Sequence, residues 1–320
     1  MHSDKHELEE EAQAFNSRIS ERVAAGFIPD LRRAVKCDYF YKSFWRDPQF
    51  IDLYLGKINR EYLDLLGKHC GQAKSILDVG CGAGYMSLEL ARNGYHVDAI
   101  DISDRCIEEA RAVLDGNPYK DGFGSLRYHV MPLHEAEGAY DVVLFSVSLH
   151  HMTDLDGALR KARALLKPGG HLLCYEPCHD RWQLSDAAQV MLIRGLLALT
   201  GHWYDRDEVP RDMESDAELL RMTQDVHEEY FHERDKSEAG QSPHDNESSG
   251  AEMLEALRRN FTELETRPGH SFIYRLLGGI RGGEDEIRKL SDFIAAYDRF
   301  AVASGFMNPN GFYFIGRTRD

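Results

Sequence analysis

Residues 75–84 read Ser-Ile-Leu-Asp-Val-Gly-Cys-Gly-Ala-Gly, an apolar run that passes directly into a turn with glycine at every second position. The apolar run predicts a buried strand, and Tyr85–Asn93 predicts the helix that follows it. The three glycines permit positive φ angles and allow a ligand to lie against the main chain. A second expected strand, 95–100, ends at Asp101, whose carboxylate can accept hydrogen bonds from both hydroxyls of a ribose. The pattern predicts a nucleoside site at the carboxyl edge of a parallel sheet.

The glycine spacing distinguishes between two kinds of nucleoside cofactor. A dinucleotide site has the pattern G-x-G-x-x-G and a helix N-terminus that receives a pyrophosphate. Here the pattern is G-x-G-x-G, and Asp78 lies two residues before it, where an acid would repel a pyrophosphate but suits a cationic amino-acid group. The run Leu77–Gly84 closely resembles the first motif of class I S-adenosylmethionine-dependent methyltransferases, and 99–103 resembles their second. This resemblance implies S-adenosylmethionine as the cofactor.

Later segments continue the likeness in the order and spacing of that family. Residues 140–146 resemble its fourth strand, 149–152 the loop after it, and 165–173 the turn before its fifth strand. The likeness covers about Ser75–Glu176. It implies an α/β fold with a doubly wound seven-stranded sheet, in which the seventh strand (Phe312–Arg317) runs antiparallel between the fifth and sixth.

The resemblance places the methionine part of the cofactor on the glycine turn and the ribose on Asp101. After the third expected strand the sequence lacks the acid that often holds the adenine amino group in this family, so adenine is expected near the backbone of 131–133. The expected cofactor-binding residues are Asp78, Gly80, Cys81, Gly82, Gly84, Asp101, Ile102, Met131, Pro132, Leu133, Ser146 and His151.

Methyl transfer is an in-line displacement at a carbon that the sulfonium already activates, so alignment of donor and acceptor is the main requirement. A base is needed only where the acceptor must lose a proton. The candidates are His150, Glu176 and His179, with loop packing and a capping carboxylate as the alternatives for the first two. Four residues are expected to contact the substrate, with a packing cap as the alternative for the first two and a solvated acidic helix for the last two: Tyr41, Arg46, His227 and Tyr230.

Four regions are expected along the chain. Residues 1–70 predict an N-terminal helical cap, in which 7–22 is polar and expected to fray or to pack late. Residues 71–177 predict the cofactor-binding core, 178–250 a largely helical insertion or lid, and 251–320 the rest of the core. Within the insertion, the apolar run 187–200 fits a buried helix, a tunnel wall or a dimer contact. The run 227–233 fits a solvated acidic helix, a lid over the substrate or, least of all, a metal site together with the nearby His244 and Asp245; no metal is predicted.

Composition limits the class of substrate. A formal net charge of −16 disfavours a nucleic-acid substrate, because phosphate binding needs a basic face. No apolar run is long enough to span a bilayer. Six scattered cysteines without a signal peptide predict reduced thiols in the cytoplasm. We therefore expect a methyltransferase acting on a small molecule (a natural-product intermediate, sugar or lipid-linked metabolite), able to form a homodimer. The alternatives are a protein that binds the cofactor without methylating and, weakest, an NAD-dependent dehydrogenase.

Overall fold

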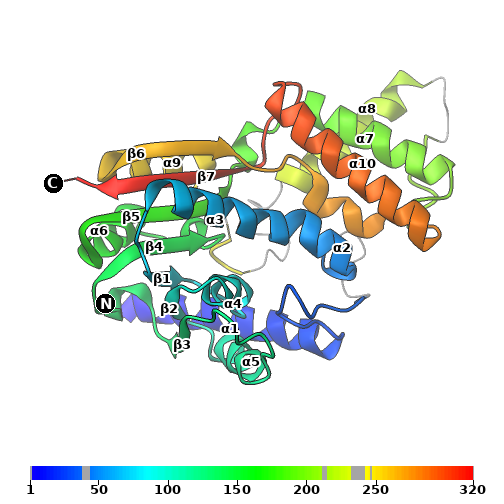
Figure 1. Cartoon of the computed structure of the whole chain (residues 1–320). Helices are drawn as coiled ribbons and strands as arrows, with labels where there is room; N and C mark the ends of the chain where they lie inside the picture. Colours follow the sequence, from blue (N-terminus) through cyan, green and yellow to red (C-terminus); the bar gives the residue numbers. More distant parts are fainter. Residues whose placement is uncertain (1, 38–43, 211–214, 232–241, 246, 320) are drawn as a thin grey trace.

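A single mixed sheet of seven strands runs through the protein in the order β3-β2-β1-β4-β5-β7-β6 (Figure 1). The computed structural model describes every residue except 1, 38–43, 211–214, 232–241, 246 and 320. β7 pairs antiparallel with both β5 and β6, whereas the remaining strand pairs are parallel. This confirms the predicted topology, including the position of the seventh strand.

The elements follow the expected alternation. The strands are β1 (Ser75–Val79), β2 (His96–Asp101), β3 (Ser125–Val130), β4 (Tyr140–Ser146), β5 (Leu166–Pro177), β6 (Phe261–Pro268) and β7 (Gly311–Thr318). The α-helices are α1 (His2–Ala24), α2 (Pro48–Ile51), α3 (Lys57–His69), α4 (Tyr85–Arg92), α5 (Asp104–Asp115), α6 (Leu155–Ala164), α7 (Leu184–Leu199), α8 (Asp216–Phe231), α9 (Gly250–Asn260) and α10 (Glu284–Ala303). Shorter helical turns are η1 (Phe44–Arg46), η2 (Asp52–Gly56), η3 (Leu133–Glu135), η4 (Leu149–His151), η5 (His179–Arg181), η7 (Ile273–Arg275) and η8 (Leu277–Gly279).

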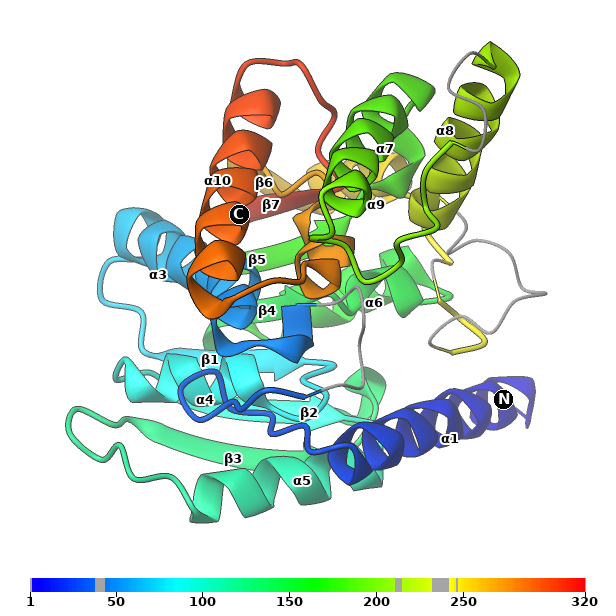
Figure 2. The same ribbon diagram turned by 90° about the vertical axis from the view of Figure 1, so that its right-hand side faces the viewer.

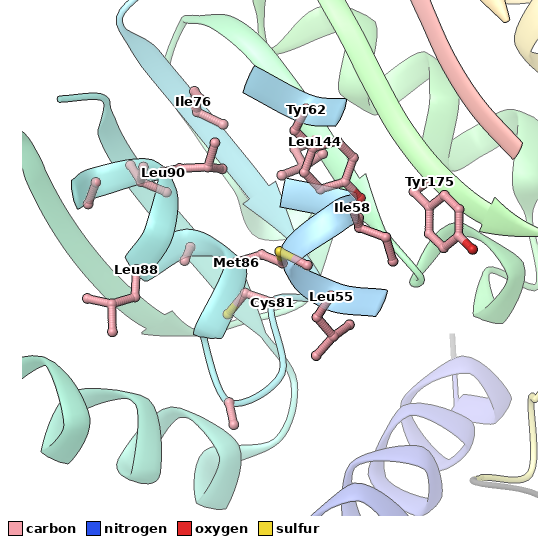
Figure 3. Packing of buried hydrophobic residues seen from close by; sticks show 14 of the residues in the cluster. Leu55, Ile58, Tyr62, Ile76, Cys81, Met86, Leu88, Leu90, Leu144 and Tyr175 are labelled. Carbon is pink, nitrogen blue, oxygen red and sulfur yellow. The ribbon is translucent and has the colours of Figure 1, made fainter. Parts of the chain in front are cut away.

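Alternate strand residues supply two separate cores, one on each face of the sheet. On the first face, Ile76 and Leu144 pack beneath α3, which contributes Ile58 and Tyr62 (Figure 3). α4 and α5 cover the same face. On the other face, Leu77 and its neighbours pack against α6 and α9. Because side chains alternate along a strand, two apolar faces require the near-continuous apolar runs that the sequence contains.

A third core lies beyond the end of the sheet and joins α7, α8 and α10. Its buried members include Trp182, Trp203 and Phe272. Figure 2 shows these helices grouped at the β6 end of the sheet, whereas α1 lies beside α5 at the β3 end. The interpretation of the apolar run 187–200 as a buried helix holds for only one side of α7. That side belongs to this core, whereas Leu192, Leu196 and Leu199 are exposed. Among the described residues, no helix is long and apolar enough to cross a membrane.

The polar helix α1 packs against the first core, although its sequence predicts a segment that frays or packs late. Ile19 is buried in the first core, and Asn16 binds the start of α5: its amide donates to Asp104 (2.8 Å) and its oxygen accepts from the Ser103 hydroxyl (2.6 Å). Polar side chains therefore attach this helix where the sequence offers few apolar ones.

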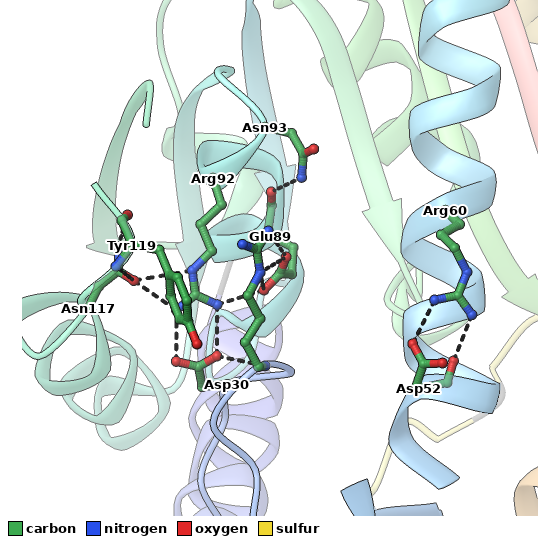
Figure 4. A network of polar contacts seen from close by, with 9 residues as sticks. Asp30, Asp52, Arg60, Glu89, Arg92, Asn93, Asn117 and Tyr119 are labelled. Atoms are coloured by element: carbon green, nitrogen blue, oxygen red, sulfur yellow. Dashed lines mark hydrogen bonds and ion pairs between the residues drawn. The ribbon is translucent and has the colours of Figure 1, made fainter. Parts of the chain in front are cut away.

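A buried arginine holds the loop that follows α1 against α4. The Arg92 guanidinium donates to both carboxylate oxygens of Asp30 (2.7 and 2.8 Å), to Glu89 (2.6 Å) and to Asn117 (Figure 4). The Tyr119 ring covers the guanidinium at 4.7 Å from its centroid. Planar, bidentate pairing of this kind is strong and directional, so the loop that leads out of α1 has a fixed position beside the helix of the glycine turn.

Candidate active site

The glycine turn between β1 and α4 adopts the conformation that its sequence predicts. Gly80, Gly82 and Gly84 have φ angles of 69°, 53° and 78°. A Cβ at Gly80 would lie 2.6 Å from the Ser148 Cβ, and one at Gly84 would lie 2.4 Å from the Tyr128 hydroxyl. A Cβ at Gly82 would meet no atom within 4 Å. Packing therefore requires the outer two glycines, whereas the middle one opens toward a cavity.

That cavity has a volume of about 1820 Å³ and lies along the carboxyl ends of β1, β2, β4 and β5. Of the predicted cofactor-binding residues, all but Gly84 line it. Gly84 instead lies behind the wall, where its carbonyl accepts a hydrogen bond from the Tyr128 hydroxyl (2.9 Å).

Asp78 is the most unusual carboxyl group on the cavity wall. It is 1% exposed, and burial together with the nearby Asp101 raises its pKa to about 7. Oδ2 accepts a hydrogen bond from the Ser87 hydroxyl (2.5 Å), but no donor among the described residues reaches Oδ1. A buried carboxyl oxygen without a partner is costly. A cationic donor in the cavity, such as an ammonium group, would satisfy it.

Asp101 joins the end of β2 to the glycine turn. Its Oδ2 accepts from the backbone N–H of Gly82 (2.7 Å) and its Oδ1 from that of Ser103 (2.8 Å). Burial raises its pKa above the ordinary value, although these bonds act in the opposite direction. An ionised carboxylate has about four acceptor sites, so Asp101 can also accept from two ligand hydroxyls. Next to it, Ile102 and Met131 line the cavity, and so does Glu135, an acid two residues beyond the expected adenine region.

Two adjacent histidines after β4 form a polar cluster on the cavity wall. His150 Nδ1 donates to Glu176 Oε2 (2.7 Å), and His151 Nδ1 lies 3.1 Å from Glu11 Oε1 on α1. Both Nε2 atoms face Asp245, at 3.7 Å from His150 and 4.0 Å from His151. Burial by itself would lower the pKa of His151, but the bond to Glu11 and the charges of Asp245, Glu11 and Glu176 raise it.

Glu176 is corrected from a candidate base to a positioning residue. It is fully buried and lies outside the cavity lining. Its Oε1 accepts from the backbone N–H groups of Ser148 (3.0 Å) and Leu149 (2.9 Å), while Oε2 binds His150. This carboxylate therefore fixes the loop that carries the histidines. The alternative interpretation of Glu176, a capping carboxylate, describes it correctly.

The proposed substrate contacts fare differently from the cofactor residues. The prediction that Tyr230 contacts the substrate is wrong, because its side chain is fully buried. Its ring stacks on Trp182, and its hydroxyl donates to the Phe272 carbonyl (2.6 Å). His227 and Arg46 are absent from the cavity lining, and Tyr41 lies outside the described residues. His179 does line the cavity, where its Nδ1 hydrogen-bonds Asn310 Oδ1.

The far half of the cavity contains residues that sequence reasoning missed. They come from α1, η2, the turn around residue 204, and the segment after β6: Glu11, Phe15, Tyr54, Tyr204, His270, Tyr274 and Arg275. The Tyr54 and Tyr274 rings stack with their centroids 5.9 Å apart. No short motif marks these positions, because they meet only in the folded chain.

Comparison with known proteins agrees with this geometry. The family model described as "Methyltransferase domain" matches residues 51–232. The "O-methyltransferase resE" of Aspergillus sclerotiorum is 31% identical over 151 residues, which is 46% of this chain and 56% of that protein. The "Ubiquinone biosynthesis O-methyltransferase" of Acinetobacter baylyi is 30% identical over 124 residues, 37% of this chain and 50% of its own. The chain thus spans about half the length of these curated relatives.

A solved structure extends the likeness to the whole fold. The geranyl diphosphate C-methyltransferase of Streptomyces coelicolor, determined with Mg²⁺, geranyl-S-thiolodiphosphate and S-adenosyl-L-homocysteine, superposes with a TM-score of 0.50. The match covers 98% of each chain at 14% sequence identity. At this identity, the comparison supports the fold alone.

Proposed function

Because the chain belongs to the class I S-adenosylmethionine-dependent methyltransferases and S-adenosylmethionine is its cofactor, we propose that it transfers the methyl group to a hydroxyl oxygen of a small organic molecule. One observation carries this proposal. One cavity is lined both by the glycine turn and by histidine and tyrosine side chains from other segments of the chain. Donor and acceptor would therefore share one enclosure.

The residues of the turn fit the cofactor. Asp78 Oδ1, which has no partner among the described residues, would accept from the ammonium of the methionine part. Gly82 leaves open space at the wall, and Asp101 would bind the ribose hydroxyls. Bound there, the cofactor supplies a methyl group on a sulfonium, and the protein supplies alignment, which is worth up to roughly 7–11 kcal/mol of the barrier.

We assign the role of general base to His179. Asn310 Oδ1 accepts from its Nδ1, which fixes the tautomer in which Nε2 is the basic nitrogen. The residue follows β5 directly and lines the cavity. The histidines and the stacked tyrosines favour a planar hydroxylated acceptor, such as a phenol, and the two O-methyltransferase relatives support oxygen as the atom methylated.

The test is incubation of the purified protein with methyl-labelled cofactor and a panel of phenols, aliphatic alcohols and amines. We expect label in the phenolic ethers. His179→Gln should lower kcat by about 10²–10⁴-fold without changing the affinity for S-adenosylhomocysteine. The matched control is His96→Gln, because His96 is an exposed histidine at the amino end of β2, the end opposite Asp101.

Two results would count against the proposal. Label found only in amine products would replace oxygen by nitrogen as the acceptor atom. Tight binding of S-adenosylhomocysteine with no labelled product from any acceptor would favour a protein that binds the cofactor without methylating.

A further inference from the structure

Three potential metal ligands from two distant segments meet at the cavity wall. One ring nitrogen each from His150 and His151 and a carboxylate oxygen of Asp245 lie within 4.8 Å of one another. Zinc bonds of about 2.0–2.1 Å in tetrahedral geometry separate ligand atoms by about 3.4 Å. The two distances to Asp245, 3.7 and 4.0 Å, are thus close to those of a metal site.

The hydrogen bonds behind the histidines prepare both rings for metal binding. Each ring offers its Nδ1 to a carboxylate, Glu176 for His150 and Glu11 for His151. Donation from Nδ1 leaves the Nε2 lone pair directed at Asp245. A carboxylate behind the imidazole is the usual partner of a metal-bound histidine, because it fixes the tautomer and increases the basicity of the ligand.

The charge of the cluster also calls for a cation. The side chains of Glu11, Glu176 and Asp245 are 6%, 0% and 8% exposed, so three carboxylates share a largely buried space. Metal binding requires both histidines in the neutral form, and in that form the cluster carries a formal charge of −3. Buried charges are stable when they are paired or coordinate a metal, and a dication would neutralise most of this charge.

From these contacts we propose that His150, His151 and Asp245 bind one divalent transition-metal ion of the zinc type. Imidazole nitrogen suits Zn²⁺, Fe²⁺ or Co²⁺, whereas Mg²⁺ and Ca²⁺ prefer sites made of oxygen ligands. Three protein ligands leave at least one coordination position open to the cavity.

The role of the ion rests on the proposed function, although its binding does not. A hydroxyl oxygen of the acceptor would occupy the open position, where the ion lowers the pKa of the hydroxyl. The O–H bond breaks and the proton passes to the base His179. The oxygen then forms a bond to the methyl carbon, the carbon–sulfur bond breaks, and its electron pair stays on sulfur to give neutral S-adenosylhomocysteine.

The test measures metal binding in the absence of any acceptor. Full-length protein is stripped with a chelator and titrated with Co²⁺, whose visible ligand-field absorption reports nitrogen and oxygen ligands in four- or five-coordinate geometry, and with Zn²⁺ in a calorimeter. We expect one equivalent of each ion. Asp245→Asn should abolish the cobalt spectrum. Glu11→Gln, which alters a supporting carboxylate, should weaken Zn²⁺ binding by about 10–100-fold.

The matched control is Glu247→Gln, because Glu247 binds His244 in the same segment and lies outside the cluster. It should bind both ions as the parent protein does. Equal binding by the parent and Asp245→Asn, or no stoichiometric binding by a parent that still binds S-adenosylhomocysteine, would overturn the metal site. Methyl transfer is measured separately, so a failure of the proposed function would appear as intact metal and cofactor binding without product.

Discussion

The buried carboxylate of Glu176 accepts a hydrogen bond from His150 Nδ1 (2.7 Å to Oε2). The same carboxylate accepts from two backbone N–H groups of the loop that carries the histidine. A residue at the end of β5 thereby sets the position of a cavity-wall side chain that follows β4. Replacing this carboxylate is expected to disturb the fold before it disturbs any chemical step.

Glu176→Ala should lower the free energy of unfolding by about 3 kcal/mol or more. The substitution leaves the N–H groups of Ser148 and Leu149 buried without acceptors, and each such group costs about 1–3 kcal/mol. Urea unfolding measures the change. Glu176→Gln, which retains one oxygen acceptor, should recover part of the loss. An alanine variant of unchanged stability but reduced kcat would instead restore Glu176 as a base.

Asp101→Ala should weaken binding of S-adenosylhomocysteine by about 10–100-fold, since hydrogen bonds to a charged group contribute roughly 1.5–3 kcal/mol. Calorimetric titration measures the affinity. Asp98→Ala is the control on the same strand, because Asp98 pairs with the exposed Arg127. If both variants bind with the parent's affinity, Asp101 does not hold the ribose.

Cofactor affinity should depend on pH through Asp78. In the ligand-free protein its pKa is raised from 3.8 to about 7. The folded state therefore holds a proton that the unfolded state releases, so this group makes stability fall as pH rises from about 4 to 7. A bound ammonium favours the ionised form. Affinity for S-adenosylhomocysteine should accordingly rise by up to about tenfold per pH unit below 7 and then level off.

Calorimetry across this range should also detect proton release on binding, as a dependence of the measured heat on the buffer. Asp78→Asn should bind weakly and without this pH dependence. A parent protein whose affinity is flat between about pH 5.5 and 8.5 would show that Asp78 does not meet the ammonium.

Alanine substitutions at two glycines of the turn should have different effects, one mainly on stability and the other mainly on cofactor affinity. Gly84→Ala places a methyl group against the Tyr128 ring at a φ of 78° and should destabilise the protein by about 2 kcal/mol or more. Gly82→Ala meets open space, so its fold should survive at a cost of about 1–2 kcal/mol for the left-handed backbone. Its added methyl should reduce cofactor affinity. Thermal unfolding and calorimetry measure the two effects, and the reverse pattern would contradict this assignment.

The sequence predicted the sheet and the residues that line the cavity at the glycine turn, because the deciding residues are contiguous. The turn 78–84 and Asp101 lie in short motifs that need no distant partner. The acceptor side could not be predicted in this way. Tyr230 lies in an acidic helical run, and only the stacking of Trp182 against it shows that it belongs to a core.

Asp245 was considered as a metal ligand beside the run 227–233, but its meeting with His150 and His151 escaped prediction for a related reason. It lies in a polar loop, and Glu11 draws that loop to the histidines by accepting from the Ser242 hydroxyl (2.5 Å) and the His244 N–H (3.0 Å). The lid role of residues 178–250, the homodimer and the cytoplasmic location stay predictions, which no observation on the molecule tests.

The position of Glu11 makes the polar helix α1 part of the cavity wall. One carboxylate from the start of the chain touches both a loop more than two hundred residues away and a histidine of the sheet edge. A shortened protein that begins after this helix would contain the segments of the sheet and the glycine turn, but its cavity would lack the lining residues that α1 supplies. A truncation that removes Glu11 would therefore change the cavity itself.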